Sequence, residues 1–238
     1  MFAIRQNLQA VHERISAAAS AAGRPPESVR LLAVSKTFDA AAVRMAYEAG
    51  QIAFGENYLQ EALEKQALLQ DLPLEWHFIG PLQSNKTRPA AEHFAWVHTV
   101  DRLKIAERLS AQRPSDLPPL NICLQVNISG EASKSGIAPA DLPALAAAVA
   151  GLPQLRLRGL MAIPAPAPEA APEVRRAPFA QMRALFEQLR AEYGAQPAFA
   201  AFDTLSMGMS DDLEDAVAQG ANLVRIGSAI FGKRHYPA

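Results

Sequence analysis

The sequence has very little net charge and a single cysteine. Its 238 residues carry a formal net charge of -1, from 23 Lys and Arg against 24 Asp and Glu. Nucleic acids and anionic membranes attract a strong positive field, so this balance argues against both as partners. Cys123 cannot form an internal disulfide, which favours a reducing, cytoplasmic setting. Because it lies inside an apolar run, Cys123 is predicted to fill the core rather than act as a nucleophile.

Long apolar runs and an apolar leader are also missing. Arg5, Gln6 and Asn7 stand where a signal peptide needs its apolar segment, and no stretch approaches the ~18 apolar residues of a membrane span. We therefore expect no membrane association. No metal-ligand set is predicted. A Gly-rich dinucleotide fingerprint is absent after the first apolar run, which continues into Ser35-Lys36-Thr37, so a Rossmann fold is disfavoured.

What the sequence does contain is an alternation of short apolar runs with helical patterns. The predicted strands are Arg30–Ser35, Gln51–Phe54, Glu75–Ile79, Trp96–Val100, Leu120–Val126, Arg156–Ala162, Phe202–Ser206 and Asn222–Ile226. The predicted helices are an opening one through Ile4, Leu8, Val11 and Ile15, then Ala40–Ala49, Tyr58–Leu69, Asp101–Ala111, Pro139–Ala150, Phe179–Tyr193 and Asp212–Gln219. Alternation of this kind implies parallel pairing with right-handed crossovers. Eight such units predict an α/β fold, a closed (β/α)₈ TIM barrel, as one domain over residues 1–238.

Local signals predict several element ends. Asp101 is expected to open one helix, and Asp211 with Glu214 has the spacing of a capping box. Gly50 and Gly220 are expected to close two helices in the left-handed conformation. The segment 164–178, rich in Pro and Ala, predicts an irregular connection, either an ordinary surface loop or a lid over the barrel mouth.

The functional face of such a barrel lies at the carboxyl ends of its strands, and Lys36 ends the first one. Strand alternation places Leu32, Val34 and Lys36 on one inward face. Apolar surroundings lower the pKa of a lysine and make its amine nucleophilic toward an aldehyde. The alternative is a lysine that reaches the rim and pairs with Glu56.

The seventh and eighth strands end in small polar residues that favour an anion site. Gly227 and Ser228 follow the eighth strand and are expected to open a short helix, where exposed backbone N–H groups bind phosphate. Ser206 and Ser210 follow the seventh strand. Ordinary turns have similar composition, so a plain turn is the alternative. The neighbouring carboxylates of 211 and 212 are expected to cap their own helix.

Arg225 shares a strand face with Leu223 and Gly227, so it is predicted to point inward. One interpretation is a structural ion pair with a nearby acid. The other is a hydrogen bond from its guanidinium to a pyridine nitrogen. A lysine, an inward arginine and a phosphate loop together are far more specific for a cofactor than any one of them.

Six segments carry a family resemblance. They are LLAVSK at 31–36, FGENY at 54–58, WHFIGPLQSNK at 76–86, GLMAI at 159–163, SMGMSDD at 206–212 and VRIGSAIFG at 224–232. Together they resemble the YggS/PROSC family of pyridoxal 5′-phosphate (PLP) homeostasis proteins, over nearly the whole chain. The resemblance implies a barrel like the alanine racemase N-terminal domain (fold-type III), with PLP held as a Schiff base on Lys36.

The resemblance also implies the surroundings of the cofactor. Phosphate contacts are expected at Ser206, Ser210, Gly227 and Ser228, with Arg225 near the pyridine nitrogen. Further cofactor-binding positions are Asn57, His77, Asn85 and Met161, the last at the end of the sixth strand. No catalytic residue is predicted.

The function favoured by the sequence is that of a protein that buffers PLP or donates it to apo-enzymes. Two enzymatic functions are the alternatives. A racemase needs a second proton-transferring group, which alanine racemases draw partly from a β domain after the barrel; here the sequence stops at Ala238, soon after the eighth strand, so we expect none. For the same reason a monomer is favoured. The other alternative is a cofactor-free Schiff-base aldolase. Lys134, in the loop after the fifth strand, is either a second amine for transfer or an ordinary solvated charge.

Overall fold

Within residues 2–131 and 135–232, which the computed structural model describes, eight parallel strands close into a barrel in chain order. The first strand pairs with the last, with Leu32 opposite Arg225. The predicted (β/α)₈ barrel is confirmed. The strands are β1 (Arg30–Val34), β2 (Ala53–Glu56), β3 (Glu75–Phe78), β4 (Trp96–Val100), β5 (Leu120–Gln125), β6 (Leu155–Met161), β7 (Thr204–Ser206) and β8 (Leu223–Ile226).

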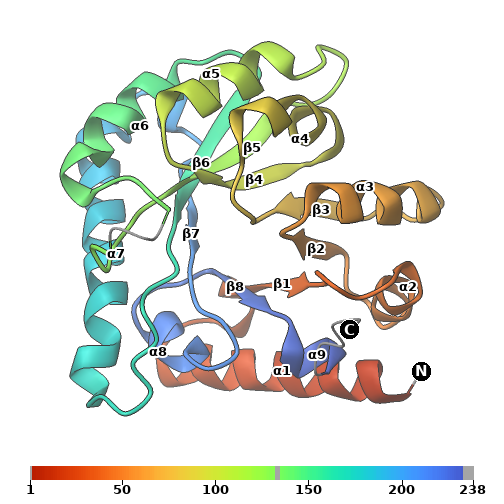
Figure 1. The fold of residues 1–238 in the computed structure, drawn as a ribbon. Coiled ribbons are helices and arrows are strands. Elements are labelled where there is room, and N and C mark those ends of the chain that lie inside the picture. The colour runs from red at the N-terminus through yellow and green to blue at the C-terminus, as the bar shows by residue number, and fades with distance from the viewer. Residues whose placement is uncertain (1, 132–134, 233–238) are drawn as a thin grey trace.

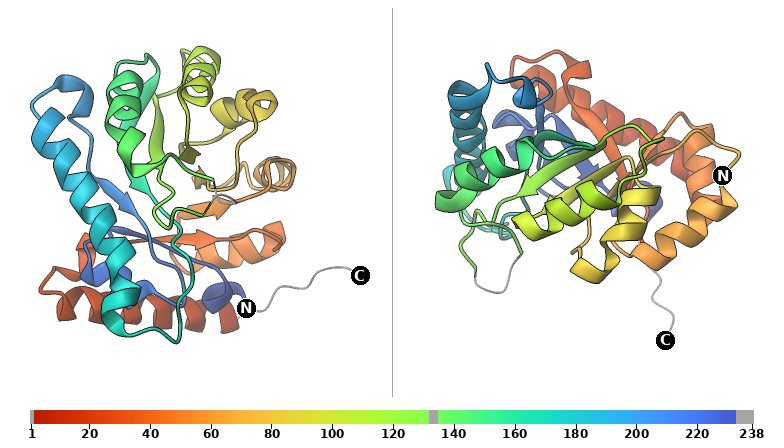
Figure 2. Two further views of the ribbon diagram at one scale, coloured as in Figure 1. Left: turned by 60° about the vertical axis from the view of Figure 1, so that its left-hand side comes forward. Right: turned by 90° about the horizontal axis from the view of Figure 1, so that it is seen from above.

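Helices surround this ring of strands, as the two turned views show (Figure 2). They are α1 (Phe2–Ala21), α2 (Ala40–Glu48), α3 (Leu59–Leu68), α4 (Thr87–His93), α5 (Leu103–Gln112), α6 (Leu142–Ala150), α7 (Pro172–Tyr193), α8 (Leu213–Ala218) and α9 (Ser228–Phe231). Among the described helices, none is long and apolar enough to cross a membrane.

Strand alternation divides the core into two layers. Outward side chains such as Leu31 and Val224 join the large apolar cluster between barrel and helices. Inward side chains such as Leu32, Val34 and Leu223 form a separate cluster inside the barrel. The predicted inward face of β1 and β8 is therefore confirmed. Cys123 is buried as expected, and desolvation raises the pKa of its thiol to about 12.

The N-terminal helix α1 lies along α8 and α9, the two short helices that flank β8 (Figure 1). Asn7 Nδ2 donates to the carbonyl of Ile230 at 2.9 Å, and Arg24 donates to the carbonyls of Val217 and Ala221. The end of α8, its connection to β8, and α9 are thus held from outside the barrel by α1 and the turn that follows it.

Some predicted element ends are wrong. The helix α5 begins at Leu103 with Arg102 at its N-cap, because the Asp101 carboxylate accepts from the Arg102 guanidinium instead of capping. The capping box at the start of α8 does not form. Asp212 Oδ1 accepts from the backbone N–H of Met209, and Glu214 pairs with Arg14. Gly50 and Gly220 do have positive φ after their helices, as predicted.

Helix α7 begins at Pro172, within the segment predicted to be irregular, and Pro178 lies inside it. Proline removes one backbone donor and normally ends a helix. Here the turn before Pro178 is held from outside, since Arg175 and Arg176 both pair with Asp215 of α8, at 2.8 and 2.7 Å. The short helix α4, between β3 and β4, was not predicted at all.

Candidate functional site

A cavity of about 200 Å³ opens at the carboxyl ends of β1 and β8. It brings together most of the polar residues predicted for the site. Its lining is Val34, Lys36, Asn57, Ile79, Ile163, Met209, Ser210, Asp211, Arg225, Gly227 and Ser228. Lys36 is half-buried, directly beyond the apolar end of β1. The sequence-predicted lysine, arginine and phosphate loop therefore share one pocket.

Arg225 reaches this pocket from the barrel interior, where it is only 4% exposed. Its Nη1 donates to Ser206 Oγ at 2.8 Å and its Nη2 to the carbonyl of Ala162 at 2.9 Å. Burial lowers the pKa of the guanidinium to about 10, so the group still carries its proton and charge at neutral pH. It is a fixed donor at the floor of the pocket.

Behind Arg225 a hydrogen-bonded chain runs through the barrel to Glu75. His98 Nδ1 lies 3.0 Å from Ser206 Oγ, His98 Nε2 lies 2.9 Å from His77 Nδ1, and His77 Nε2 lies 2.7 Å from Glu75 Oε1. The Glu75 carboxylate, whose pKa is lowered by its bond to His77, only accepts, so with both imidazoles neutral the donors run back along the chain and the Ser206 hydroxyl donates to His98. Each histidine then accepts at Nδ1 and donates from Nε2. Burial lowers the pKa of both histidines, which fits this neutral state.

The loop after β8 enters α9 at Gly227 and Ser228. The first N–H groups of a helix have no partner within it, so they face whatever lies at its start. Gly227 packs tightly on β1, where an added Cβ would meet the Val34 carbonyl at 3.1 Å. A larger residue would push this loop away from Lys36. On the opposite side, Asn57 Oδ1 is buried and lacks a hydrogen-bond partner among the described residues.

Glu56 was predicted, as an alternative, to pair with Lys36 at the rim; in the structure it pairs with Lys65 instead. Its Oε1 accepts from Ser35 Oγ at 2.6 Å and pairs with Lys65 Nζ at 2.7 Å. Desolvation raises the pKa of the Glu56 carboxyl, against the opposing effect of Lys65 and Ser35. Lys65 was not predicted from the sequence as part of the site. The sequence feature that could have indicated a buried Lys65 is its spacing, because it follows Ala62 by three residues on the buried face of α3.

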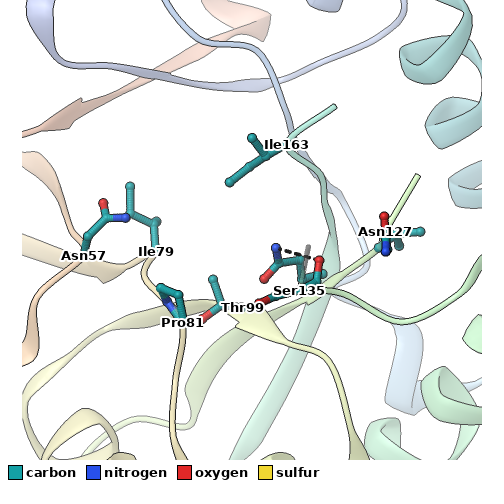
Figure 3. Close-up of a pocket in the computed structure, with 9 residues that line it drawn as sticks. Asn57, Ile79, Pro81, Thr99, Asn127, Ser135 and Ile163 are labelled. Atoms are coloured by element: carbon teal, nitrogen blue, oxygen red, sulfur yellow. Dashed lines mark hydrogen bonds between the residues drawn. The ribbon is translucent and has the colours of Figure 1, made fainter. Parts of the chain in front are cut away.

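A second cavity of about 330 Å³ adjoins the first and shares Asn57, Ile79 and Ile163 with it. Figure 3 shows Asn57 and Ile79 on one side and Asn127 and Ser135 on the other. Gln125 Nε2 donates to the carbonyl of Ser135 across its floor at 3.3 Å. The lining carries amide and hydroxyl groups without formal charge, and it widens the barrel mouth beyond the Lys36 pocket.

Four predicted cofactor contacts lie elsewhere. His77 and Ser206 belong to the chain behind Arg225, and Met161 packs inside the barrel with Trp96 and Cys123. Asn85 is exposed in the 3₁₀ helix Ser84–Lys86. As cofactor contacts they stay predictions. Lys134 falls outside the described residues. Within the described part of the chain, no group of three or more His, Cys, Asp and Glu is arranged to hold a metal ion.

Comparison with known proteins places this site in context. Residues 6–235 match the family model described as "Alanine racemase, N-terminal domain". The pyridoxal phosphate homeostasis protein of Pseudomonas aeruginosa is 65% identical over 238 residues, covering 100% of this chain and 99% of the relative. The protein of the same name from Escherichia coli K12 is 57% identical, covering 98% and 97%.

A solved relative shares the fold. The structure of PipY from Synechococcus elongatus PCC7942 with PLP bound matches with a TM-score of 0.82 and 42% identity, over 96% of this chain and all of that one. The barrel, the arrangement at its mouth and the identity along the chain lead to one assignment. This chain belongs to the family of pyridoxal phosphate homeostasis proteins, built on the alanine racemase N-terminal domain.

Proposed function

We propose that this protein binds PLP in the Lys36 pocket, holds it as a Schiff base on Lys36, and acts in PLP homeostasis as a buffer or a donor to apo-enzymes. One observation carries the proposal: an amine, a buried guanidinium and a helix start line the same cavity of about 200 Å³. The names of the relatives from P. aeruginosa and E. coli, and the PLP bound in PipY, support it.

The residues present fit this cofactor. When bound, PLP supplies an aldehyde that a lysine amine takes up reversibly. Arg225 would donate to the pyridine nitrogen, and Ser210, Gly227 and Ser228, which line the pocket at the start of α9, would hold the phosphate. Asn57 Oδ1, buried and without a hydrogen-bond partner in the described part of the chain, would be available as an acceptor beside the cofactor. Lys36, between these groups, provides the amine.

The charge state of Arg225 suits storage of the cofactor. A protonated guanidinium cannot accept a hydrogen bond, so it favours an unprotonated pyridine nitrogen. That state weakens the ring as an electron sink and narrows the carbanion chemistry that a racemase needs. The two close relatives are likewise named for homeostasis.

The setting proposed for this function is the cytoplasm, with the chain acting as a monomer and as one binding unit over residues 1–238. The single, buried Cys123 supports a reducing compartment. The near-neutral net charge argues against a nucleic-acid partner. Apo forms of PLP-dependent enzymes are the proposed recipients.

The test is the absorbance spectrum with added PLP, before and after borohydride, for the wild type and Lys36→Ala. We expect an imine band in the wild type, loss of the band in Lys36→Ala, and a reduced adduct mapped by mass spectrometry to Lys36. Lys104→Ala, at an exposed lysine of α5, is the matched control and should keep the band. An equally strong imine without Lys36 contradicts the proposal.

A further inference from the structure

The two peptide groups on either side of the Lys36 Cα are both held by α3. The carbonyl of Ser35 accepts from Lys65 Nζ at 2.7 Å, and the N–H of Thr37 donates to Glu61 Oε1 at 2.6 Å. Lys65 and Glu61 form an ion pair at 2.6 Å, one turn apart on the helix. A single pair of side chains therefore fixes the backbone just before and just after Lys36.

This pair is built into the protein rather than added at its surface. Lys65 is only 4% exposed, and its ammonium lies within 2.7 Å of three oxygens, from Ser35, Glu56 and Glu61. Three acceptors match the three N–H groups of an ammonium. A buried charge is retained at such a position only when it is paired and hydrogen-bonded. Lys65 is thereby kept as a structural cation, apart from the pocket that Lys36 lines.

The backbone at Thr37 shows what the pair holds in place. Thr37 has φ +68°, in the left-handed region that β-branched residues strongly avoid. Such a conformation persists only where its surroundings determine it. The bond from Thr37 N–H to Glu61 is one such determinant. This bend redirects the chain immediately after Lys36, and the bond to Glu61 holds the peptide group between Lys36 and Thr37 in one orientation.

We propose that Glu61 and Lys65 are positioning residues that orient the Lys36 backbone so that its amine meets the aldehyde of the cofactor. The inference rests on the proposed function. It differs from that function in naming residues that contact neither the pocket nor the cofactor but determine how readily the imine forms. Small misplacements of a reacting group cost large factors in rate and equilibrium.

The test compares PLP with pyridoxine 5′-phosphate, which keeps the ring and phosphate but carries an alcohol in place of the aldehyde. Both affinities are measured by calorimetry, and the rate of imine formation by stopped-flow absorbance. We expect Glu61→Ala to weaken PLP binding and slow imine formation by about tenfold or more. Pyridoxine 5′-phosphate should bind within about twofold of wild type, because it forms no bond to Lys36.

Two further variants make the result decisive. Glu61→Asp keeps the charge but shortens the reach to Thr37, so it should show the same selective loss with less disturbance of folding. Glu64→Ala removes an exposed carboxylate of the same helix, bonded to Gln60, and should change nothing. If the folded Glu61 variants lose both ligands equally, or neither, the positioning role is wrong. A wild type that forms no imine overturns the proposed function itself.

Discussion

At the residue scale, the groups that accept hydrogen bonds from the buried Arg225 guanidinium, Ser206 and the carbonyl of Ala162, are themselves buried. Ser206 accepts one guanidinium N–H and donates its own hydroxyl hydrogen to His98, so its removal leaves that N–H of Arg225 and the Nδ1 of His98 without a partner. Ser206→Ala is expected to lower the free energy of unfolding by about 1–3 kcal/mol, the range for an unsatisfied buried polar group. Urea denaturation measures this loss.

The control for that prediction is Ser20→Ala, at an exposed position of α1, which should stay within about 0.5 kcal/mol of wild type. Equal stability of the Ser206 and Ser20 variants would show that the chain behind Arg225 contributes nothing to stability. PLP affinity should also fall in Ser206→Ala, because the floor of the pocket loses the group that orients Arg225.

The two buried histidines predict a pH dependence of stability. Burial lowers the pKa of His77, and that of His98 falls well below the ordinary 6.5. In this pH range the unfolded chain therefore binds more protons than the native barrel. The contribution of the two histidines to the free energy of unfolding is fully present above their unfolded pKa and is lost as pH falls from about 7 toward about 5. Each histidine contributes up to about 1.4 kcal/mol per pH unit in this window.

Urea unfolding across that window checks the histidine prediction. His98→Gln should flatten the dependence of unfolding free energy on pH, because a neutral amide takes up no proton in the unfolded chain. His12→Gln, at an exposed histidine of α1, should keep the wild-type slope. A steep slope that survives in His98→Gln would assign the effect to other groups.

At the scale of elements, α1 acts on the site without entering it. Arg14 donates to the carbonyl of Ser210 at 2.7 Å and pairs with Glu214, which ties the loop after β7 to the outside of the barrel. Arg14→Ala should weaken PLP binding by about two- to fivefold, the scale of a half-exposed charged pair. Titration of the imine band measures it.

A matched control exists on α2. Arg44 forms a bidentate pair with Asp71, and its side chain is 38% exposed against 37% for Arg14, but it lies away from the pocket. Arg44→Ala should therefore leave PLP affinity unchanged. If both variants weaken binding alike, loss of surface charge rather than support of the Ser210 loop is responsible.

The elements differ in how far the sequence predicts them. Strands of a closed parallel barrel are buried on both faces, so they read as apolar runs, and Trp96–Val100 was predicted to the residue. The start of α7 was missed because Pro178 is a local stop signal, while the arginine pairs to Asp215 that override it are tertiary. Lys65 was missed for a similar reason, since a lysine on a helix reads as solvated until its buried partners are known.

The site shows the same division between local and tertiary information. Lys36, Arg225 and Gly227 were predicted from strand alternation and from their place at strand ends, which any parallel barrel shares. His77 and Ser206 were predicted as cofactor contacts, but the structure joins them to each other through His98, a residue of β4 that no local pattern singles out. Which residues far apart in sequence become hydrogen-bond partners is set by the register in which the strands pair when the barrel closes.

At the scale of the whole molecule, binding of PLP should stabilise the native barrel. The pocket is lined by β1, β8 and the segments that follow β1, β2, β3, β6, β7 and β8, so it exists only when the barrel is closed. A ligand that binds the folded state alone, at about 100 times its Kd, adds about 2.7 kcal/mol. For a chain of this size that corresponds to a rise in Tm of roughly 5 to 10 °C.

The separate contributions to that shift can be told apart by thermal melts. Lys36→Ala keeps Arg225 and the loop at Gly227 and Ser228, so PLP should still raise its Tm, by less than in wild type. Pyridoxine 5′-phosphate should give the same smaller rise in both proteins, because neither forms an imine with it. A PLP shift that is as large in Lys36→Ala as in wild type would mean that the covalent bond adds nothing to holding the cofactor. A shift abolished in Lys36→Ala would mean instead that the guanidinium and the start of α9 do not bind the ring and phosphate by themselves.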